Sequence, residues 1–274
     1  MLSQRVLVAA LLLPLGIIAI LLGGLWFVLL VALILGLAAW EFAGLFRSGG
    51  FAPSGPLILI GVLALVAARF FAGFAYDPWL VPLLILTSMK IHLFDFERGR
   101  DQAATDFALT LAGILYFGVL GSFMLLLRQL EHGQWWLLLT LPAVWIADSA
   151  AYFLGTRYGR NKMAPRLSPK KSWQGYFAGV LFGAIGAPLL LLLYRQWGLP
   201  AGLGFSLANA AILGLAMGLF PTLGDLGESM IKRQVGVKDS GTILPGHGGM
   251  FDRIDSWLWA LPVAYFLITG VFLR

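Results

Sequence analysis

Long apolar segments, separated by short polar or glycine-rich stretches, make up most of the chain. A hydrocarbon core about 30 Å thick requires about 20 consecutive apolar residues from a helix that crosses it. By that criterion we predict spans near 6–22, 25–46, 57–75, 79–94, 107–127, 134–155, 173–194, 203–232 and 256–273. The first segment lacks the small-residue cleavage site of a signal peptide, so it is interpreted as a span. We therefore expect an all-α, polytopic integral membrane protein with about nine transmembrane helices.

The composition excludes an ordinary soluble protein. Of the 274 residues, 59% are hydrophobic and 12% are charged, and the mean hydropathy is +0.87. Soluble domains have about 25% charged residues. Disordered, fibrous and nucleic-acid-binding classes are excluded on the same grounds, and the net charge of +6 indicates a bias of loop charge rather than a DNA partner. The absence of cysteine excludes disulfides, thiolate metal sites and cysteine nucleophiles.

The basic residues predict the orientation in the membrane. With nine spans, fifteen of the nineteen Lys and Arg residues fall on the side of the N-terminus, and the other side has four, namely Arg69, Arg128, Arg195 and Arg274. Cytoplasmic loops are enriched in Lys and Arg. We expect an inner (cytoplasmic) membrane protein of a bacterium, with the N-terminus in the cytoplasm and the C-terminus outside.

The polar chemistry concentrates in the second half of the chain. Its polar, glycine-rich segments at 155–172 and 233–255 suggest N-terminal scaffold helices at 1–133 and a catalytic region at 134–274. Glycines recur every four residues at Gly175, Gly179 and Gly183, a spacing that lets helices approach closely. Such a face either packs within one subunit or forms the interface of a homodimer.

Four polar side chains share one face of a predicted helix at 224–233. The first is Asp225, and the others follow it at three, four and seven positions: Glu228, Ser229 and Lys232. A charge near bilayer depth costs about 2.5–3.5 kcal/mol, so it needs a partner, a cavity or a function. The simpler alternative is an interfacial ion pair such as Glu228 with Lys232.

The following segment combines carboxylates, cations and glycines. Its charged or titratable residues are Lys238, Asp239, His247, Asp252, Arg253 and Asp255, and its glycines include Gly248 and Gly249. Backbone N–H groups of a glycine-rich loop, with a helix N-terminus after it, suit a polyphosphate. Singly, these features are equally explained by turns and by first-turn helix carboxylates. His247 either donates to a phosphate or caps the turn.

Together the two segments match the needs of phosphoryl transfer. Magnesium prefers oxygen ligands and is commonly held by one or two carboxylates together with substrate phosphates. Two such ions can bind both the attacking and the leaving oxygen. We expect Mg²⁺ as cofactor, with two cation sites and oxygen ligands among Asp225, Glu228, Ser229, Asp252 and Asp255.

A second polar block lies at 148–175. Asp148 interrupts an apolar span, which indicates a cavity or, alternatively, a hydrogen-bonded contact between helices. Four residues precede a predicted helix at Trp173 and could bind phosphate: Ser168, Lys170, Lys171 and Ser172. The alternative is a basic anchor to anionic lipid head groups.

The residues from Ser229 to Asp255 resemble the signature of the phosphatidate cytidylyltransferases, also called CDP-diacylglycerol synthases, over 27 positions without a gap. The stretch Ser-Pro-Lys-Lys-Ser at 168–172 and the segment 148–152 also resemble features of that family. The resemblance covers roughly the C-terminal half, and no residue of the N-terminal half is assigned from it.

This resemblance implies a reaction in which CTP and phosphatidate give CDP-diacylglycerol and pyrophosphate with magnesium. It implies Asp225 and Asp252 as metal ligands with Ser229 beside them. We assign Lys232, Arg233, Lys238 and Arg253 to the phosphates, and Lys170 and Lys171 to CTP or the lipid head group. The partners expected are CTP, phosphatidate and membrane lipids.

Other functions remain open from the sequence. A CTP-dependent lipid kinase would release CDP instead of pyrophosphate. A transporter could use Asp148 and Asp225 to relay ions, although the spans show no obvious inverted repeat. A CDP-alcohol phosphotransferase would have an Asp-Gly motif followed by Ala-Arg and further spaced aspartates, which this sequence lacks.

Overall fold

A computed structural model describes residues 2–200, 205–243 and 248–273, with side chains described from residue 10 onward except at 11. Within this part, eight helical segments are long and apolar enough to cross a membrane: Gly24–Ser48, Gly55–Ala72, Asp77–Glu97, Ala103–Gln129, Gly133–Tyr158, Trp173–Gln196, Leu207–Gln234 and Phe251–Phe272. Each overlaps one predicted span. The span predicted at 6–22 coincides with helix α1 (Leu2–Leu22). Its apolar part within the described side chains, Leu12–Leu22, is shorter than the other eight helical segments. The all-α polytopic fold is confirmed.

The chain forms two compact units, which are described separately. Unit 1 contains residues 1–126 and 231–254, and unit 2 contains residues 127–230 and 255–274. The chain therefore passes between units within helices α6 (Phe123–Gln129) and α10 (Pro221–Gln234), and again after Ile254. The division into a scaffold at 1–133 and a catalytic region at 134–274 stays a prediction; by compactness, residues 231–254, which include most of the segment from Ser229 to Asp255, belong to unit 1.

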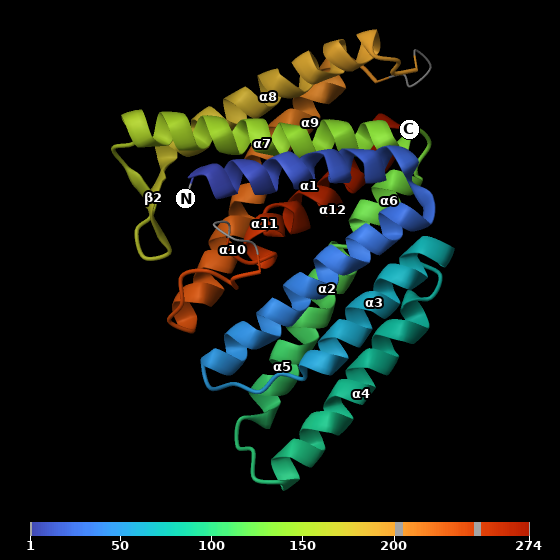
Figure 1. Cartoon of the computed structure of the whole chain (residues 1–274), viewed down its shortest axis with the longest axis vertical. Coiled ribbons are helices and arrows are strands. Elements are labelled where there is room, and N and C mark those ends of the chain that lie inside the picture. The colour runs from blue at the N-terminus through green and yellow to red at the C-terminus, as the bar shows by residue number, and fades with distance from the viewer. Residues whose placement is uncertain (1, 201–204, 244–247, 274) are drawn as a thin grey trace. The chain divides into compact units, whose positions relative to one another are not determined.

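Unit 1 is built on the packing of α2 (Gly24–Ser48), α3 (Gly55–Ala72), α4 (Asp77–Glu97), α5 (Ala103–Gly113) and the π-helix η1 (Ile114–Leu120) (Figure 1). Fully buried apolar side chains from these helices, such as Ile58, Val62 and Phe117, form its core. The short helix α11 (Phe251–Ile254) packs against α2. A π-helical turn widens the backbone and is frequent at functional sites.

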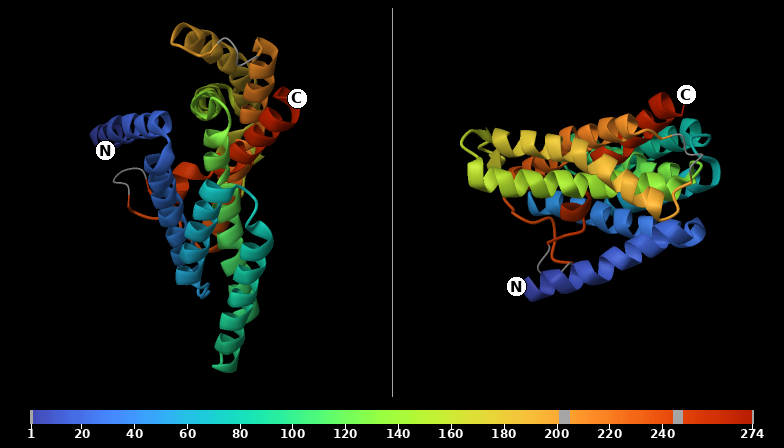
Figure 2. Two further views of the ribbon diagram at one scale, coloured as in Figure 1. Left: turned by 90° about the vertical axis from the view of Figure 1, so that its right-hand side faces the viewer. Right: turned by 90° about the horizontal axis from the view of Figure 1, so that it is seen from above.

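The two glycines between the predicted spans 6–22 and 25–46 favour a tight hairpin, which the first two helices do not form. The chain turns at Gly23, where φ is 64°, a left-handed conformation that glycine adopts without strain. Beyond this turn α1 and α2 diverge instead of lying side by side (Figure 2).

Unit 2 packs α7 (Gly133–Tyr158), α8 (Trp173–Gln196) and α9 (Leu207–Leu219) together, with α12 (Trp257–Leu267) and the π-helix η3 (Ile268–Phe272). The glycine face is used inside the chain: a Cβ at Gly175 or Gly179 would meet the backbone of α7, and one at Gly183 would meet Gly214 O on α9. Close packing within one subunit is thus confirmed for this face.

Unit 2 also contains two short strands that the sequence analysis did not predict. Strands β1 (Lys162–Ala164) and β2 (Ser168–Ser172) pair antiparallel, with Lys162 opposite Ser172 and Ala164 opposite Ser168. The Ser172 hydroxyl accepts a hydrogen bond from Gly175 N at 3.3 Å and so caps α8. The hairpin therefore delivers Lys171 directly to the start of α8.

Candidate active site

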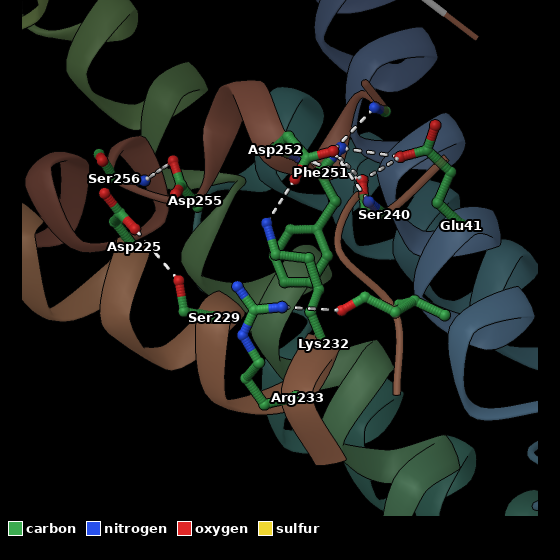
Figure 3. Close-up of polar contacts among 12 residues, drawn as sticks. Glu41, Asp225, Ser229, Lys232, Arg233, Ser240, Phe251, Asp252, Asp255 and Ser256 are labelled. Carbon is green, nitrogen blue, oxygen red and sulfur yellow. Dashed lines mark hydrogen bonds and ion pairs between the residues drawn. The ribbon is translucent and has the colours of Figure 1, made fainter. Parts of the chain in front are cut away.

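In unit 2 an ion pair joins α10 to the β hairpin. Lys171 Nζ lies 2.7 Å from Asp225 Oδ2, and the two side chains are 24% and 40% exposed. Ser229, one helical turn after Asp225, donates a long hydrogen bond of 3.4 Å to Asp225 Oδ1 (Figure 3). The predicted face of α10 therefore brings Asp225 and Ser229 together, and Lys171 is added from a segment 54 positions earlier in the chain.

Two further carboxylates of unit 2 interact with this pair. Asp255 is buried, and its Oδ1 accepts the Ser256 N–H at 2.6 Å. The charges of Asp225, Asp148 and Lys171 all act on the Asp255 carboxyl. In unit 2, Asp225 is therefore bound by Lys171, and Asp255 by the Ser256 amide.

The donor chemistry of this group fits a hard cation. Carboxylate and hydroxyl oxygens are the ligands that Mg²⁺ prefers, and uncompensated carboxylates attract it. Within residues 2–200, 205–243 and 248–273, no three acidic or histidine side chains are grouped closely enough to hold a metal ion. Mg²⁺ is usually bound by only one or two carboxylates, with water and substrate phosphates as the remaining ligands.

In unit 1 a different carboxylate, Asp252 of α11, is surrounded by donors. Its Oδ2 accepts hydrogen bonds from Ser240 N at 2.9 Å, Ser240 Oγ at 2.9 Å and Gly249 N at 2.8 Å. Its Oδ1 forms an ion pair with Lys232 Nζ (Figure 3), and these two side chains are only 7% and 12% exposed. Asp252 therefore connects the two ends of the segment between α10 and α11, because it binds Lys232 and Ser240 on one side and Gly249 on the other.

The same loop is attached to the N-terminal helices through Glu41 of α2. Glu41 Oε2 accepts a hydrogen bond from Phe251 N at 2.9 Å and another from Ser240 Oγ at 3.1 Å. The Phe251 ring is fully buried, and its nearest ring neighbours include Phe117, at 4.9 Å between centroids, and Phe42, at 6.3 Å. Sequence reasoning missed Glu41, although a carboxylate inside an apolar span is itself a signal.

The other predicted residues lie around these two clusters. Arg233 donates to Val237 O at 3.4 Å. Gly248 has a φ of 78°, which favours glycine, and Gly249 is buried beside Ser240. Glu228 and Ser172 are buried, Ser168 is partly buried, and the exposed residues are Lys170, Lys238, Asp239 and Arg253. His247 lies outside the described residues.

The structure thus brings together Asp225, Ser229 and Lys171 in unit 2, and Asp252 and Lys232 in unit 1, while the charges of Asp148 and Asp225 influence the buried Asp255. Asp225 and Asp252 belong to different units. That they bind one set of cations remains a prediction.

Comparison with known proteins gives a consistent result. The model of the cytidylyltransferase family matches residues 3–271. A phosphatidate cytidylyltransferase of Synechocystis sp. is 31% identical over 297 residues, covering 97% of this chain and 96% of the relative. The protein of the same name from Pseudomonas aeruginosa is 35% identical over 268 residues, covering 96% and 95%. That of Haemophilus influenzae is 44% identical over 132 residues, covering 48% and 44%.

Proposed function

Since the chain belongs to the cytidylyltransferase family and is a nucleotidyltransferase, we propose that it transfers CMP from CTP to phosphatidate by metal-assisted in-line displacement at the cytoplasmic face of the membrane. The observation that supports this most directly is the contact of Asp225 with both Lys171, at 2.7 Å, and Ser229, at 3.4 Å, in unit 2. Carboxylate and hydroxyl oxygens can hold a cation between two anionic reactants.

The proposed reaction forms one bond and breaks one. A phosphate oxygen of phosphatidate attacks the α-phosphorus of CTP, and the bond from this phosphorus to the bridging oxygen of the β-phosphate breaks. Pyrophosphate leaves and CDP-diacylglycerol remains. The attacking oxygen is already ionised at neutral pH, so the protein needs no general base and acts by positioning and electrostatics.

Asp225, Asp255 and Ser229 would hold Mg²⁺, which when bound neutralises phosphate charge. Lys171, beside Asp225, orients a phosphate by its ammonium group. Asp252 is a candidate ligand for a second ion, but both of its oxygens are bonded, so a cation at Oδ1 would have to replace the Lys232 ammonium. Lys232, Arg233, Lys238 and Arg253 are proposed to bind phosphate.

Labelled CTP tests the activity. Purified protein with Mg²⁺ and phosphatidate should convert the cytidine label into a lipid-soluble product and release one pyrophosphate for each product formed. Release of CDP with unlabelled lipid product would identify a lipid kinase instead. Ion flux into protein-containing liposomes without nucleotide, together with no lipid product, would identify a transporter.

The proposed orientation has its own test, because the chain contains no cysteine. Single Gln102→Cys and Gln196→Cys variants place one thiol in each of two exposed positions, after α4 and at the end of α8. A membrane-impermeant maleimide should label the first only in inverted vesicles and the second only in right-side-out vesicles. The reverse pattern would contradict a cytoplasmic N-terminus. The homodimer also stays a prediction.

A further inference from the structure

Glu41 is a buried carboxylate far along the chain from the signature residues that it contacts. It lies in the apolar span of α2 and is 7% exposed. Its hydrogen-bond partners Ser240 and Phe251 are 199 and 210 positions away. Among the described residues it has no cationic partner, so its burial is compensated only by these donors. A buried carboxylate is costly unless it is hydrogen-bonded, which argues for a function of Glu41 at this loop.

The Ser240 hydroxyl links Glu41 to Asp252. Its Oγ lies 3.1 Å from Glu41 Oε2 and 2.9 Å from Asp252 Oδ2, and it also accepts the Asp252 N–H at 3.3 Å. A serine hydroxyl has one hydrogen to donate, so the two carboxylates share it. A displacement of either carboxylate therefore changes the bonding of the other.

The space around Glu41 explains two glycines of the loop. A Cβ at Gly241 would overlap Glu41 Oε1, and a Cβ at Gly249 would overlap both Ser240 Oγ and Glu41 Oε2. The loop backbone thus lies directly against the carboxylate, and only glycine leaves room for it. The bonds and the contacts are all made inside unit 1.

The neighbouring aromatic rings hold the backbone donor in place. Phe251, whose N–H is bonded to Glu41, packs edge-on against Phe117 and Phe42. Tyr116 of η1 adds a third ring at 6.2 Å between centroids. A fixed ring on one side and a fixed carboxylate on the other leave the Phe251 amide little freedom.

We infer that Glu41 is a positioning residue: through Ser240 and the Phe251 amide it holds the loop before α11 so that the Asp252 carboxylate stays in its working orientation. In this role Glu41 acts through Ser240 and Phe251, the residues to which it is hydrogen-bonded. The effect on turnover rests on the proposed function, whereas the effect on loop order does not.

The test compares Glu41→Ala, Glu41→Gln and Ser240→Ala with the control Val62→Ala, which removes fully buried apolar atoms from α3 of the same unit. Hydrogen exchange is measured at the amides of Ser240, Gly249 and Phe251, and kcat and the KM for CTP are measured on the same samples. Glu41→Ala should accelerate exchange of the Phe251 amide at least tenfold and lower kcat at least tenfold, with less than a threefold change in KM.

Glu41→Gln should restore most of the Phe251 amide protection, because its amide oxygen can still accept that hydrogen bond. Val62→Ala should lower the melting temperature without changing exchange at these amides. Glu41 and Ser240 act on one carboxylate. The fold-reduction in kcat of the double variant Glu41→Ala with Ser240→Ala should therefore be smaller than the product of the two single fold-reductions.

Two results would overturn the inference. One is unchanged protection of the Phe251 amide in Glu41→Ala. The other is a kcat for Glu41→Ala equal to that of Val62→Ala when both are measured at the same interval below their melting temperatures. If wild-type protein forms no lipid product, the proposed function fails, and the exchange measurements still decide whether Glu41 positions the loop.

Discussion

Asp252 and Asp225 are both candidate metal ligands, yet their surroundings are opposite. Asp252 in unit 1 accepts three hydrogen bonds on one oxygen and an ammonium group on the other. Asp225 in unit 2 has one ion pair and one long hydrogen bond, and it acts electrostatically on another carboxylate, Asp255. A carboxylate surrounded by donors stabilises the fold, whereas carboxylates that outnumber their donors destabilise it and attract a cation. From this difference we predict that Asp252 contributes more to stability than Asp225, and that Asp225 contributes to activity without stabilising the fold.

The largest effect is expected at Asp252. Asp252→Ala leaves the Lys232 ammonium and the N–H groups of Ser240 and Gly249 without this acceptor. Breaking a buried pair costs about 3–5 kcal/mol, so both the free energy of unfolding and turnover should fall. Thermal unfolding in detergent and the CTP assay measure the two, with Asp101→Asn in the exposed α4–α5 loop as control. An unchanged melting temperature would show that these donors do not stabilise unit 1.

Asp225→Asn should reduce turnover without reducing stability. Its ion pair with Lys171 is partly exposed and worth about 0–1 kcal/mol, and losing the carboxylate relieves repulsion from Asp255. Removing one group that stabilises transition-state charge typically lowers kcat by about 10²–10³-fold. The measurements are kcat at saturating CTP and the melting temperature without Mg²⁺. A clear loss of stability would erase the contrast with Asp252.

Lys171→Ala sharpens the account of unit 2. Lys171 is the cation whose charge acts on Asp255 together with those of Asp148 and Asp225. Without it, Mg²⁺ should bind more tightly to this part of unit 2. A gain of about 1.4 kcal/mol in binding free energy would lower the Mg²⁺ concentration required about tenfold. Turnover should fall, because the same ammonium group is proposed to orient a phosphate. Activity is titrated with Mg²⁺ at fixed CTP, and Lys162→Ala on the neighbouring strand controls for loss of charge. A higher Mg²⁺ requirement would contradict this electrostatic description.

The smallest effect is expected from a helix cap far from either cluster in the chain. Ser206 accepts the Asn209 N–H at 3.0 Å and caps α9, so Ser206→Ala should cost about 1 kcal/mol of stability. Turnover below the melting range should be unchanged. This variant calibrates how far a modest loss of stability in unit 2 alone lowers activity, and a large fall in kcat would weaken the interpretation of Asp225→Asn.

Much of the fold was predictable, because the length of apolar segments is a local property. Eight predicted spans overlap helices that are long and apolar enough to cross a membrane, and the spacing of Gly175, Gly179 and Gly183 correctly indicated close helix packing. The β hairpin was not predicted, since its polar residues show no alternating pattern. The sequence also did not indicate that residues 231–254 belong to unit 1. The apolar side chain of Phe251 indicates that it is buried, but not which helices surround it.

The site was predictable where helical spacing determines it. Asp225 and Ser229 are one turn apart, and their contact followed from the sequence. Glu41 did not, because no local pattern connects it with Ser240 and Phe251. The lone carboxylate in an apolar span was nevertheless visible, and the same criterion had singled out Asp148.

The attachment of the loop to α2 has a consequence for biosynthesis. A ribosome completes Glu41 long before Phe251, from which it is separated by 210 positions, so the nascent α2 enters the bilayer before its hydrogen-bond partners have been made. Closing a contact across so much chain is slow compared with forming the helices themselves. A nascent chain released before this loop therefore lacks the donors that bind Glu41, together with α11, α12 and η3.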